Sequence, residues 1–250
     1  MANRAASEVP FLLVGGRDLL ASVVTSFDEA TEGVLGETTG IGPTHGVWKS
    51  SKGVGIRFAS MAQSGFFDTA TGGVHDALNE RQGISQVVSY AFSGGAIGAM
   101  FVGLEGAFGS KYKRVLTLTD LHKANADYTV TGAKEEGKLL HGATAETGAT
   151  WDSEASSVDN AASSAAGGAG YLQVLDLTLG GYTSATVNVR HSADNAVWAT
   201  LMTFTAVTAG PSAERKPVAG TVNRYLATSG AWVGAGSDMS ITPVVGFYRG

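Results

Sequence analysis

The stretch Ser184–Arg190 (SATVNVR) carries the clearest structural signal in this chain of 250 residues. Its alanine and two valines alternate with serine, threonine, asparagine and arginine. This period of two is typical of a β-strand with one face in a core and the other in water. The same alternation recurs in residues 202–206 and 239–247, where Pro243 indicates an edge strand or a bulge. These segments predict antiparallel β-structure in the last third of the chain.

Further strand candidates lie on both sides of this stretch, and glycine, proline and asparagine turn signals separate the later ones. So many short strands with little helical pattern predict a β-sandwich or barrel. The strand candidates are Phe11–Val14, Ser22–Phe27, Val54–Phe58, Ile84–Phe92, Arg114–Leu121, Tyr128–Thr131, Tyr171–Leu179 and Arg224–Thr228. One short helix is expected within Asp68–Arg81, because Val74, Ala77 and Leu78 recur at helical spacing.

A low-complexity stretch divides the sequence. Residues 141–170 are nearly all small or polar, a composition that buries too little apolar surface to form a core. We therefore expect a β domain over residues 1–140, a linker or extended loop over 141–170, and a second β unit over 171–250.

Composition excludes several classes of protein. There is no cysteine, so disulfide scaffolds, cysteine-ligated metals and thiol nucleophiles are ruled out. The formal charge of −5 argues against tight binding of nucleic acid, which requires a basic surface. Residues 90–109 are apolar enough to suggest a membrane span. However, their six glycines weaken a helix, and a period-two pattern over residues 84–92 leads into them, so no membrane partner is expected.

No catalytic motif is complete. Residues 132–138 (GAKEEGK) resemble a phosphate-binding loop, but Leu139 stands where Ser or Thr should bind magnesium, so a charged turn is the better interpretation. The five histidines are far apart in the sequence, and there is no nucleophile elbow. We therefore expect no enzyme, no cofactor and no metal site.

The segment Asp28–Pro43 is acidic and rich in glycine, which predicts a long mobile loop inside a compact half. Long loops of this kind are usually functional. Phe27–Gly42 (FDEATEGVLGETTGIG), Phe58–Leu78 (FASMAQSGFFDTATGGVHDAL) and Leu177–Phe204 together resemble the major tail proteins of long-tailed, siphophage-type bacteriophages. The likeness covers nearly the whole chain.

This resemblance implies a mainly β fold: a tail-tube-like β-sandwich or barrel with one short helix, followed by a C-terminal antiparallel β-sandwich unit. It implies a structural virion protein that self-assembles into rings, expected to be hexameric, which stack into a tail tube through which DNA passes without tight binding. The implied partners are further copies of the chain and the tape-measure, tail-terminator and distal tail proteins. The implied location is the phage tail, after synthesis in the host cytoplasm.

The resemblance also implies interface residues. The long loop would contact the neighbouring ring, and the short helix would help to join subunits. The loop residues are Asp28, Glu29, Glu32, Glu37 and Gly40, and the helix residues are Val74, Ala77 and Leu78.

An alternative remains open at this point, namely a capsid decoration protein or a carbohydrate-binding adhesin of a phage virion. In that case Trp198, Tyr225 and Trp232 would stack on sugars.

Overall fold

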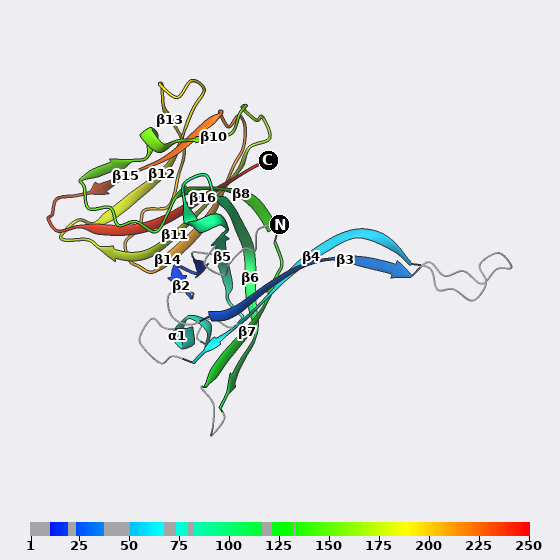
Figure 1. The fold of residues 1–250 in the computed structure, drawn as a ribbon. Coiled ribbons are helices and arrows are strands. Elements are labelled where there is room, and N and C mark those ends of the chain that lie inside the picture. Colours follow the sequence, from blue (N-terminus) through cyan, green and yellow to red (C-terminus); the bar gives the residue numbers. More distant parts are fainter. Residues whose placement is uncertain are drawn as a thin grey trace.

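A computed structural model of the chain describes residues 11–19, 24–37, 51–67, 74–79, 83–116, 122–132 and 134–250. The prediction of a mainly β protein with almost no helix is confirmed. The strands form a nearly closed, barrel-like sheet and a second, smaller sheet (Figure 1).

The first part of the chain contributes long strands and the single short α-helix. Its elements are β1 (Leu12–Val14), β2 (Arg17–Asp18), β3 (Val24–Glu37), β4 (Ser51–Phe66), α1 (Val74–Asn79), β5 (Ser85–Ala91), the 3₁₀ turn η2 (Ser93–Gly95), β6 (Met100–Val115), β7 (Lys123–Val130) and β8 (Lys134–His141).

The remainder is built from shorter strands. They are β9 (Thr150–Asp152), the 3₁₀ turn η3 (Glu154–Ser156), β10 (Val158–Asp159), β11 (Gly168–Thr178), β12 (Ser184–Ser192), β13 (Ala199–Thr203), β14 (Ser212–Val218), β15 (Tyr225–Val233) and β16 (Ser240–Arg249).

Strand β6 organises the larger sheet. It pairs with β5 along one edge and with β8 and then β7 along the other, always antiparallel. From β8 the sheet continues through β16 and β11 to β14, and from β5 through β1 to β2. From β7 it continues through β4 to β3. The sheet therefore forks at the β7–β8 junction, which gives the molecule a barrel and a separate branch.

Gln173 on β11 closes the barrel opposite β6. Its side chain is fully buried. The amide oxygen accepts a hydrogen bond from the backbone N–H of Gly16 at 2.7 Å, and the amide nitrogen donates to the carbonyl of Val87 at 3.0 Å and to the hydroxyl of Ser89 at 3.1 Å. These bonds join β11 to the β1–β2 turn and to β5, strands that are distant along the sheet order. A buried side chain thus replaces the missing strand ladder at the seam.

Large apolar side chains and close-packed glycines fill the barrel. A Cβ atom on Gly103 of β6 would lie 2.4 Å from the ring of Tyr171 on β11, so only glycine leaves room for that ring. The fully buried Phe101 ring tilts against Tyr171 with the centroids 5.6 Å apart. This cluster comprises Phe11, Leu13, Ala91, Phe101, Leu139, Ala169, Tyr171 and Val244.

The second sheet packs on the part of the barrel formed by β8, β11 and β16. Its strand order is β10-β15-β12-β13, and β9 also pairs with β15. Alternate residues of β12, among them Val187 and Val189, are fully buried against Leu172, Val245 and Phe247 of the larger sheet. The period of two in residues 184–190 therefore marks the inner face of a sandwich, as the sequence predicted.

The larger sheet takes strands from both sides of the low-complexity stretch. Strand β8 is hydrogen-bonded to β16, and residues 141–170 contain β9, η3, β10 and the start of β11. Residues 171–250 accordingly complete the barrel with β11, β14 and β16 as well as supplying most of the second sheet. The division into units at 1–140, 141–170 and 171–250 remains a proposal about folding.

One local prediction was wrong, and a second was right in one of its two alternatives. Residues 134–138, interpreted as part of a charged turn, run along strand β8, where Lys138 stands opposite Met100 and Phe247. For Pro243 the edge strand is wrong, because β16 lies between β11 and β8, but the alternative of a bulge is confirmed: the β11–β16 register shifts between Val174 and Asp176, opposite Pro243 and Thr242. In residues 134–138, pairing to two neighbours outweighed the local sequence signal.

Candidate assembly interface

The most unusual feature of the fold is the long β3–β4 hairpin, which we call the β3–β4 arm. Its ladder runs from Val24 opposite Gly65 to Glu37 opposite Ser51. Strand β7 pairs only with residues 59–66 of β4, so the outer part of the arm extends beyond the sheet. Figure 1 shows β3 and β4 projecting away from the barrel. Among the described residues, β3 pairs with β4 alone, so its other edge is open.

The acidic segment is therefore a strand over much of its length, and the prediction of a mobile loop from residue 28 is wrong for residues 28–37. Asp28, Glu29, Glu32 and Glu37 all lie in β3. Gly40 lies outside the described residues. Glycine and charge weakened the local β-signal, but pairing with β4 supplies the backbone hydrogen bonds that make the strand.

Glu29 fastens the base of the arm to the barrel. Its carboxylate accepts a hydrogen bond from the hydroxyl of Tyr90 on β5 and lies 2.7 Å from the ammonium nitrogen of Lys134 on β8. Lys134 also contacts Glu136 at 2.9 Å. Burial, and then the bond to Glu29, raise the pKa of Tyr90 well above its usual value, so the phenol stays protonated and donates. Glu29 therefore orients the arm within its own chain.

Asp28, the residue before Glu29 on β3, is exposed. Because Asp28 and Glu29 are neighbours on a strand, they face opposite sides of the arm. The Glu29 carboxylate thus binds the barrel, and the Asp28 carboxylate faces solvent.

Helix α1 packs against the sheet of its own chain. Leu78 is 4% exposed and lies in a cluster with Met61 and Tyr128. His75 is hydrogen-bonded to the hydroxyl of Tyr112 at 2.8 Å, and its ring is 5.1 Å from that of Phe67. Val74 and Ala77 lie in the same helix. The structure thus assigns Leu78 to the intramolecular core, and a role for the helix between subunits stays a prediction.

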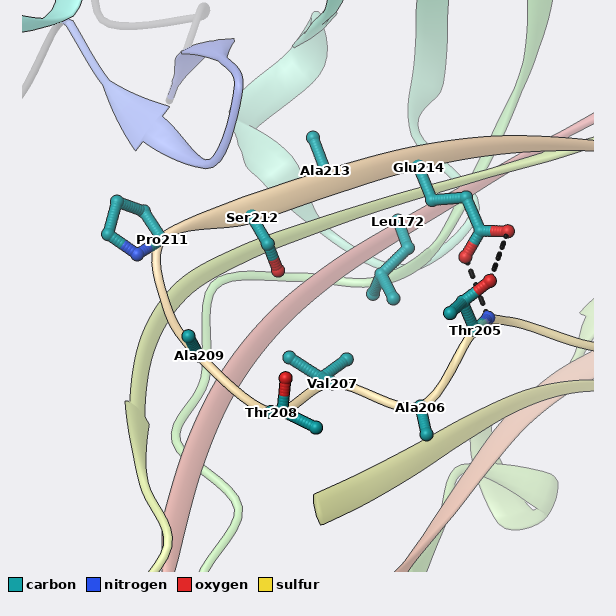
Figure 2. Close-up of a pocket in the computed structure, with 10 residues that line it drawn as sticks. All are labelled: Leu172, Thr205, Ala206, Val207, Thr208, Ala209, Pro211, Ser212, Ala213 and Glu214. Carbon is teal, nitrogen blue, oxygen red and sulfur yellow. Dashed lines mark hydrogen bonds between the residues drawn. The ribbon is translucent and has the colours of Figure 1, made fainter. Parts of the chain in front are cut away.

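A hollow of about 500 Å³ lies between β14 and residues 205–209 (Figure 2). Glu214 is the one ionisable residue in its lining, and it accepts hydrogen bonds from the N–H and the hydroxyl of Thr205 at 2.7 and 3.1 Å. Apart from Glu214, which is engaged by Thr205, no carboxylate, histidine or lysine lines this hollow. The Glu214 bonds instead hold the 205–209 segment along the edge of β14, which shields that edge from other strands.

The described part of the chain contains no cluster of three or more His, Asp or Glu side chains that could hold a metal ion. Nor is any of its helices long and apolar enough to cross a membrane.

The aromatic residues considered for sugar binding are largely engaged within the chain. The indole N–H of Trp232 donates to the carbonyl of Gly148 at 2.9 Å, and its ring packs on the sandwich core. The guanidinium of Arg224 covers the ring of Tyr225 at 4.8 Å. Trp232 and Tyr225 therefore pack against their own chain. Of the three aromatic residues, only Trp198 would remain to stack on a sugar.

No family model matches the sequence, and no curated protein matches it. Among solved structures, the fold is similar to a chain in the virion of a native gene transfer agent particle, with 13% identity, a TM-score of 0.39 and coverage of 53% of this chain and 98% of that chain. A second similar structure is a chain in the tail of an empty gene transfer agent particle, refined with C6 symmetry. Its identity is 13%, its TM-score is 0.39, and the match covers 53% of this chain and 97% of that chain.

A third solved structure is similar over more of the sequence. It is the Dit protein (gp 19.1) of SPP1, from the hub adsorption apparatus of phages that infect Gram-positive bacteria. The identity is 11%, the TM-score is 0.31, and the match covers 95% of this chain and 98% of that chain.

Proposed function

We propose that this protein is a non-enzymatic structural component of a phage virion that assembles into stacked rings and so forms a tail tube. The observation that carries the proposal is the β3–β4 arm, which extends beyond the sheet and leaves one edge of β3 unpaired within the described chain. A protruding strand with unpaired N–H and C=O groups tends to pair with a strand of another chain unless something covers its edge.

Two further features support this function. Glu29 is held by Lys134 and Tyr90, so the arm leaves the barrel from a fixed base rather than from a loose hinge. The net charge of −5 suits a tube that DNA must traverse without binding. The partners are other copies of the chain in a ring, expected to be hexameric, together with the tape-measure, terminator and distal tail proteins.

Electron microscopy of the purified protein tests the assembly itself. At high concentration, and with a tail-tip nucleus, the wild-type chain should form tubes of constant diameter. A protein that remains monomeric under both conditions would overturn the proposed function.

A shortened β3–β4 arm tests whether the arm is needed for assembly. Replacing residues 34–56 by Asn-Gly joins Gly33 to Arg57 with a two-residue hairpin turn and keeps every β4–β7 pair. We expect a soluble subunit with the circular dichroism spectrum of a β protein that forms no tubes. Val197→Asn, at a site that is 75% exposed in the connection between β12 and β13, is the control and should assemble normally. Tubes of normal length from the shortened arm would show that the arm is not the contact.

A further inference from the structure

The branch of the larger sheet has an open edge on each side. It consists of β3, β4, β7 and the last part of β6, in that order. On one side, β3 pairs with β4 alone among the described strands. On the other side, β5 accompanies β6 as far as Phe108, and the N–H of Gly83 donates to the carbonyl of Gly109. Beyond that bond, residues 110–115 pair with β7 and with no other described strand.

The directions of these two edges are compatible. Neighbouring strands of the branch are antiparallel throughout, so β6 runs antiparallel to β3. Copies related by rotation about a ring axis keep the direction of each strand relative to that axis. When the strands run along the axis, the β6 edge of one copy therefore lies antiparallel to the β3 edge of the next, as every neighbour in the branch already does.

The two faces of the branch differ in what covers them. One face lies under helix α1, where the hydroxyl of Tyr112 on β6 is hydrogen-bonded to His75. Lys111 and Lys113 flank Tyr112 along the strand, so their side chains are on the opposite, uncovered face. The register carries this face across all four strands in one row, which consists of Asp28, Ala62, Asp127 and Lys111.

The two edges also differ in charge. Residues 24–31 of β3 contain two carboxylates and no cation, and residues 59–66 of β4 beside them contain no charged residue. Residues 110–115 of β6 contain three cations and no carboxylate. Like charges disfavour the pairing of two β3 edges or of two β6 edges, whereas a β3 edge and a β6 edge attract each other.

One charge at each edge is available to a second copy. On β3, Glu29 is bound within the base of the arm, whereas Asp28 is exposed. On β6, Lys111 lies 3.9 Å from Asp127 of its own chain. Lys113 is exposed and is paired with no carboxylate among the described residues. Asp28 and Lys113 therefore lie on the same uncovered face, at its two opposite edges.

We infer that the β3 edge of one copy pairs with residues 110–115 of β6 in the next copy, with Asp28 beside Lys113. This inference rests on the proposed function and adds the contact within each ring. The contact joins two different surfaces, which is the kind of interface that closes a ring when the rotation between copies allows it.

The register of this contact follows from the alternation of side chains. Only a stagger by an even number of residues keeps the uncovered face continuous from copy to copy. Strands in a closed barrel tilt, so the rows are staggered. A stagger of two residues places Lys113, instead of the engaged Lys111, beside Asp28.

Charge reversal tests the contact. Asp28→Lys alone and Lys113→Glu alone should each lower the yield of sedimenting tubes by about tenfold. An equimolar mixture of the two variants should recover tubes, because copies that alternate around an even-numbered ring place an acid beside a base at every contact. Lys138→Glu, at an exposed cation on β8, is the matched control and should leave the yield unchanged.

Single variants that assemble normally, or a mixture of folded variants that stays unassembled, would overturn the inference while the tube function of the wild-type chain stands. Circular dichroism of each variant establishes that it is folded.

A second measurement does not depend on tubes. The chain has no cysteine, so each single-cysteine variant can form only an intermolecular disulfide. Oxidation of Asp28→Cys mixed with Lys113→Cys should give a dimer, whereas Asp28→Cys alone, or mixed with Lys138→Cys, should give none. A dimer from Asp28→Cys alone would show that two β3 edges pair and would overturn the inference. A dimer from the first mixture without wild-type tubes would retain the contact and reject the tube; wild-type tubes without that dimer would do the opposite.

Discussion

Arg215 on β14 and Glu135 on β8 form an ion pair inside the barrel, with Nη2 2.6 Å from Oε1 and Nε 3.0 Å from Oε2. Two strands, β11 and β16, separate β8 from β14 in the sheet, so the contact exists only because the sheet curls. Tyr171 donates to the same carboxylate at 2.5 Å, and Glu105 lies 3.1 Å from Arg215. The pair therefore fixes the curvature of the barrel.

Removing one partner should leave the other charged and poorly solvated. We expect Arg215→Ala to lower the free energy of unfolding by about 3 kcal/mol, measured by urea denaturation at pH 7. The matched control is Lys111→Ala, which breaks an exposed pair with Asp127 at 3.9 Å and should cost less than about 1 kcal/mol. Equal costs for the two variants would contradict a structural role for the buried pair.

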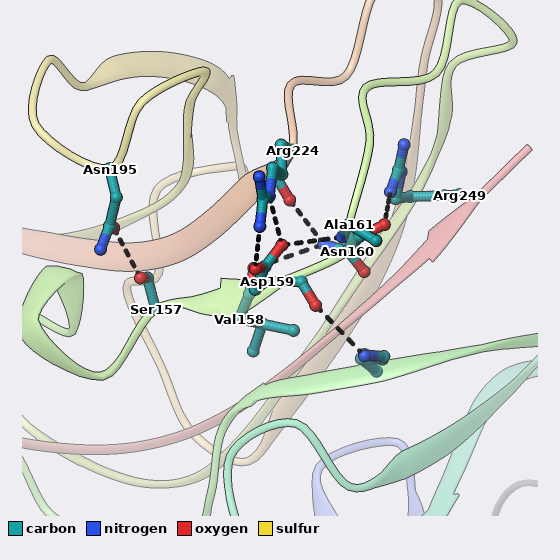
Figure 3. Close-up of polar contacts among 9 residues, drawn as sticks. Ser157, Val158, Asp159, Asn160, Ala161, Asn195, Arg224 and Arg249 are labelled. Carbon is teal, nitrogen blue, oxygen red and sulfur yellow. Dashed lines mark hydrogen bonds and ion pairs between the residues drawn. The ribbon is translucent and has the colours of Figure 1, made fainter.

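The barrel seam depends on Gln173. Gln173→Ala would leave the N–H of Gly16 and the carbonyl of Val87 without this partner, at a cost of about 1–3 kcal/mol. Hydrogen exchange should show faster exchange at Gly16, while amides in the β12–β15 ladder keep their protection. Ser157→Ala, which removes a surface bond to Asn195 at 2.7 Å (Figure 3), should change neither stability nor exchange at Gly16.

Leu78 distinguishes packing within a chain from packing between chains. Because its side chain is buried in its own subunit, Leu78→Ala should destabilise the isolated monomer by about 2–5 kcal/mol. Denaturation at a concentration below assembly measures this effect. Unchanged monomer stability combined with lost assembly would place Leu78 at a subunit interface instead.

Asp159 should make the free energy of unfolding depend on pH in the acidic range. The hydrogen bonds from Arg224 and then from the N–H of Ala161 lower the pKa of this carboxyl to about 2. A depressed folded-state pKa contributes stability above the unfolded pKa, and that contribution is lost as the pH falls toward the folded value. Asp159→Asn should therefore be less stable than wild type at pH 7, with a difference that narrows between about pH 4 and pH 2.

Urea midpoints at pH 7, 4, 3 and 2 measure this difference. Since the pair with Arg224 is exposed, salt should also reduce it. A difference that is constant across the series would show that the asparagine acts through packing and not through charge.

The strands that the sequence revealed best are those with one face in a core and one in water. Strand β12 shows this alternation along most of its length. The predicted strands at residues 84–92 and 171–179 agree with β5 and β11 to within a few residues at each end. The helix was also expected where α1 lies. Here side-chain burial follows the backbone period, so a local pattern is sufficient.

The strands that escaped prediction are held by their neighbours. The first half of β6 contains glycines, of which Gly103 must admit the Tyr171 ring, and glycine hides the strand pattern. Residues 134–138 look like a loop until pairing with β6 and β16 makes them β8. Likewise, residues 28–37 show an arm only when β4 lies beside them.

The sequence by itself determined that this is a mainly β protein without cysteine chemistry, because composition and a period of two depend only on local order. Tertiary structure alone decided that the two halves share one barrel, that Glu29 anchors an arm, and that β3 and β6 form the two edges of one branch. Each of these brings together residues far apart in the chain. The free energy of such contacts comes from pairing and burial across the fold, which no local stretch of sequence encodes.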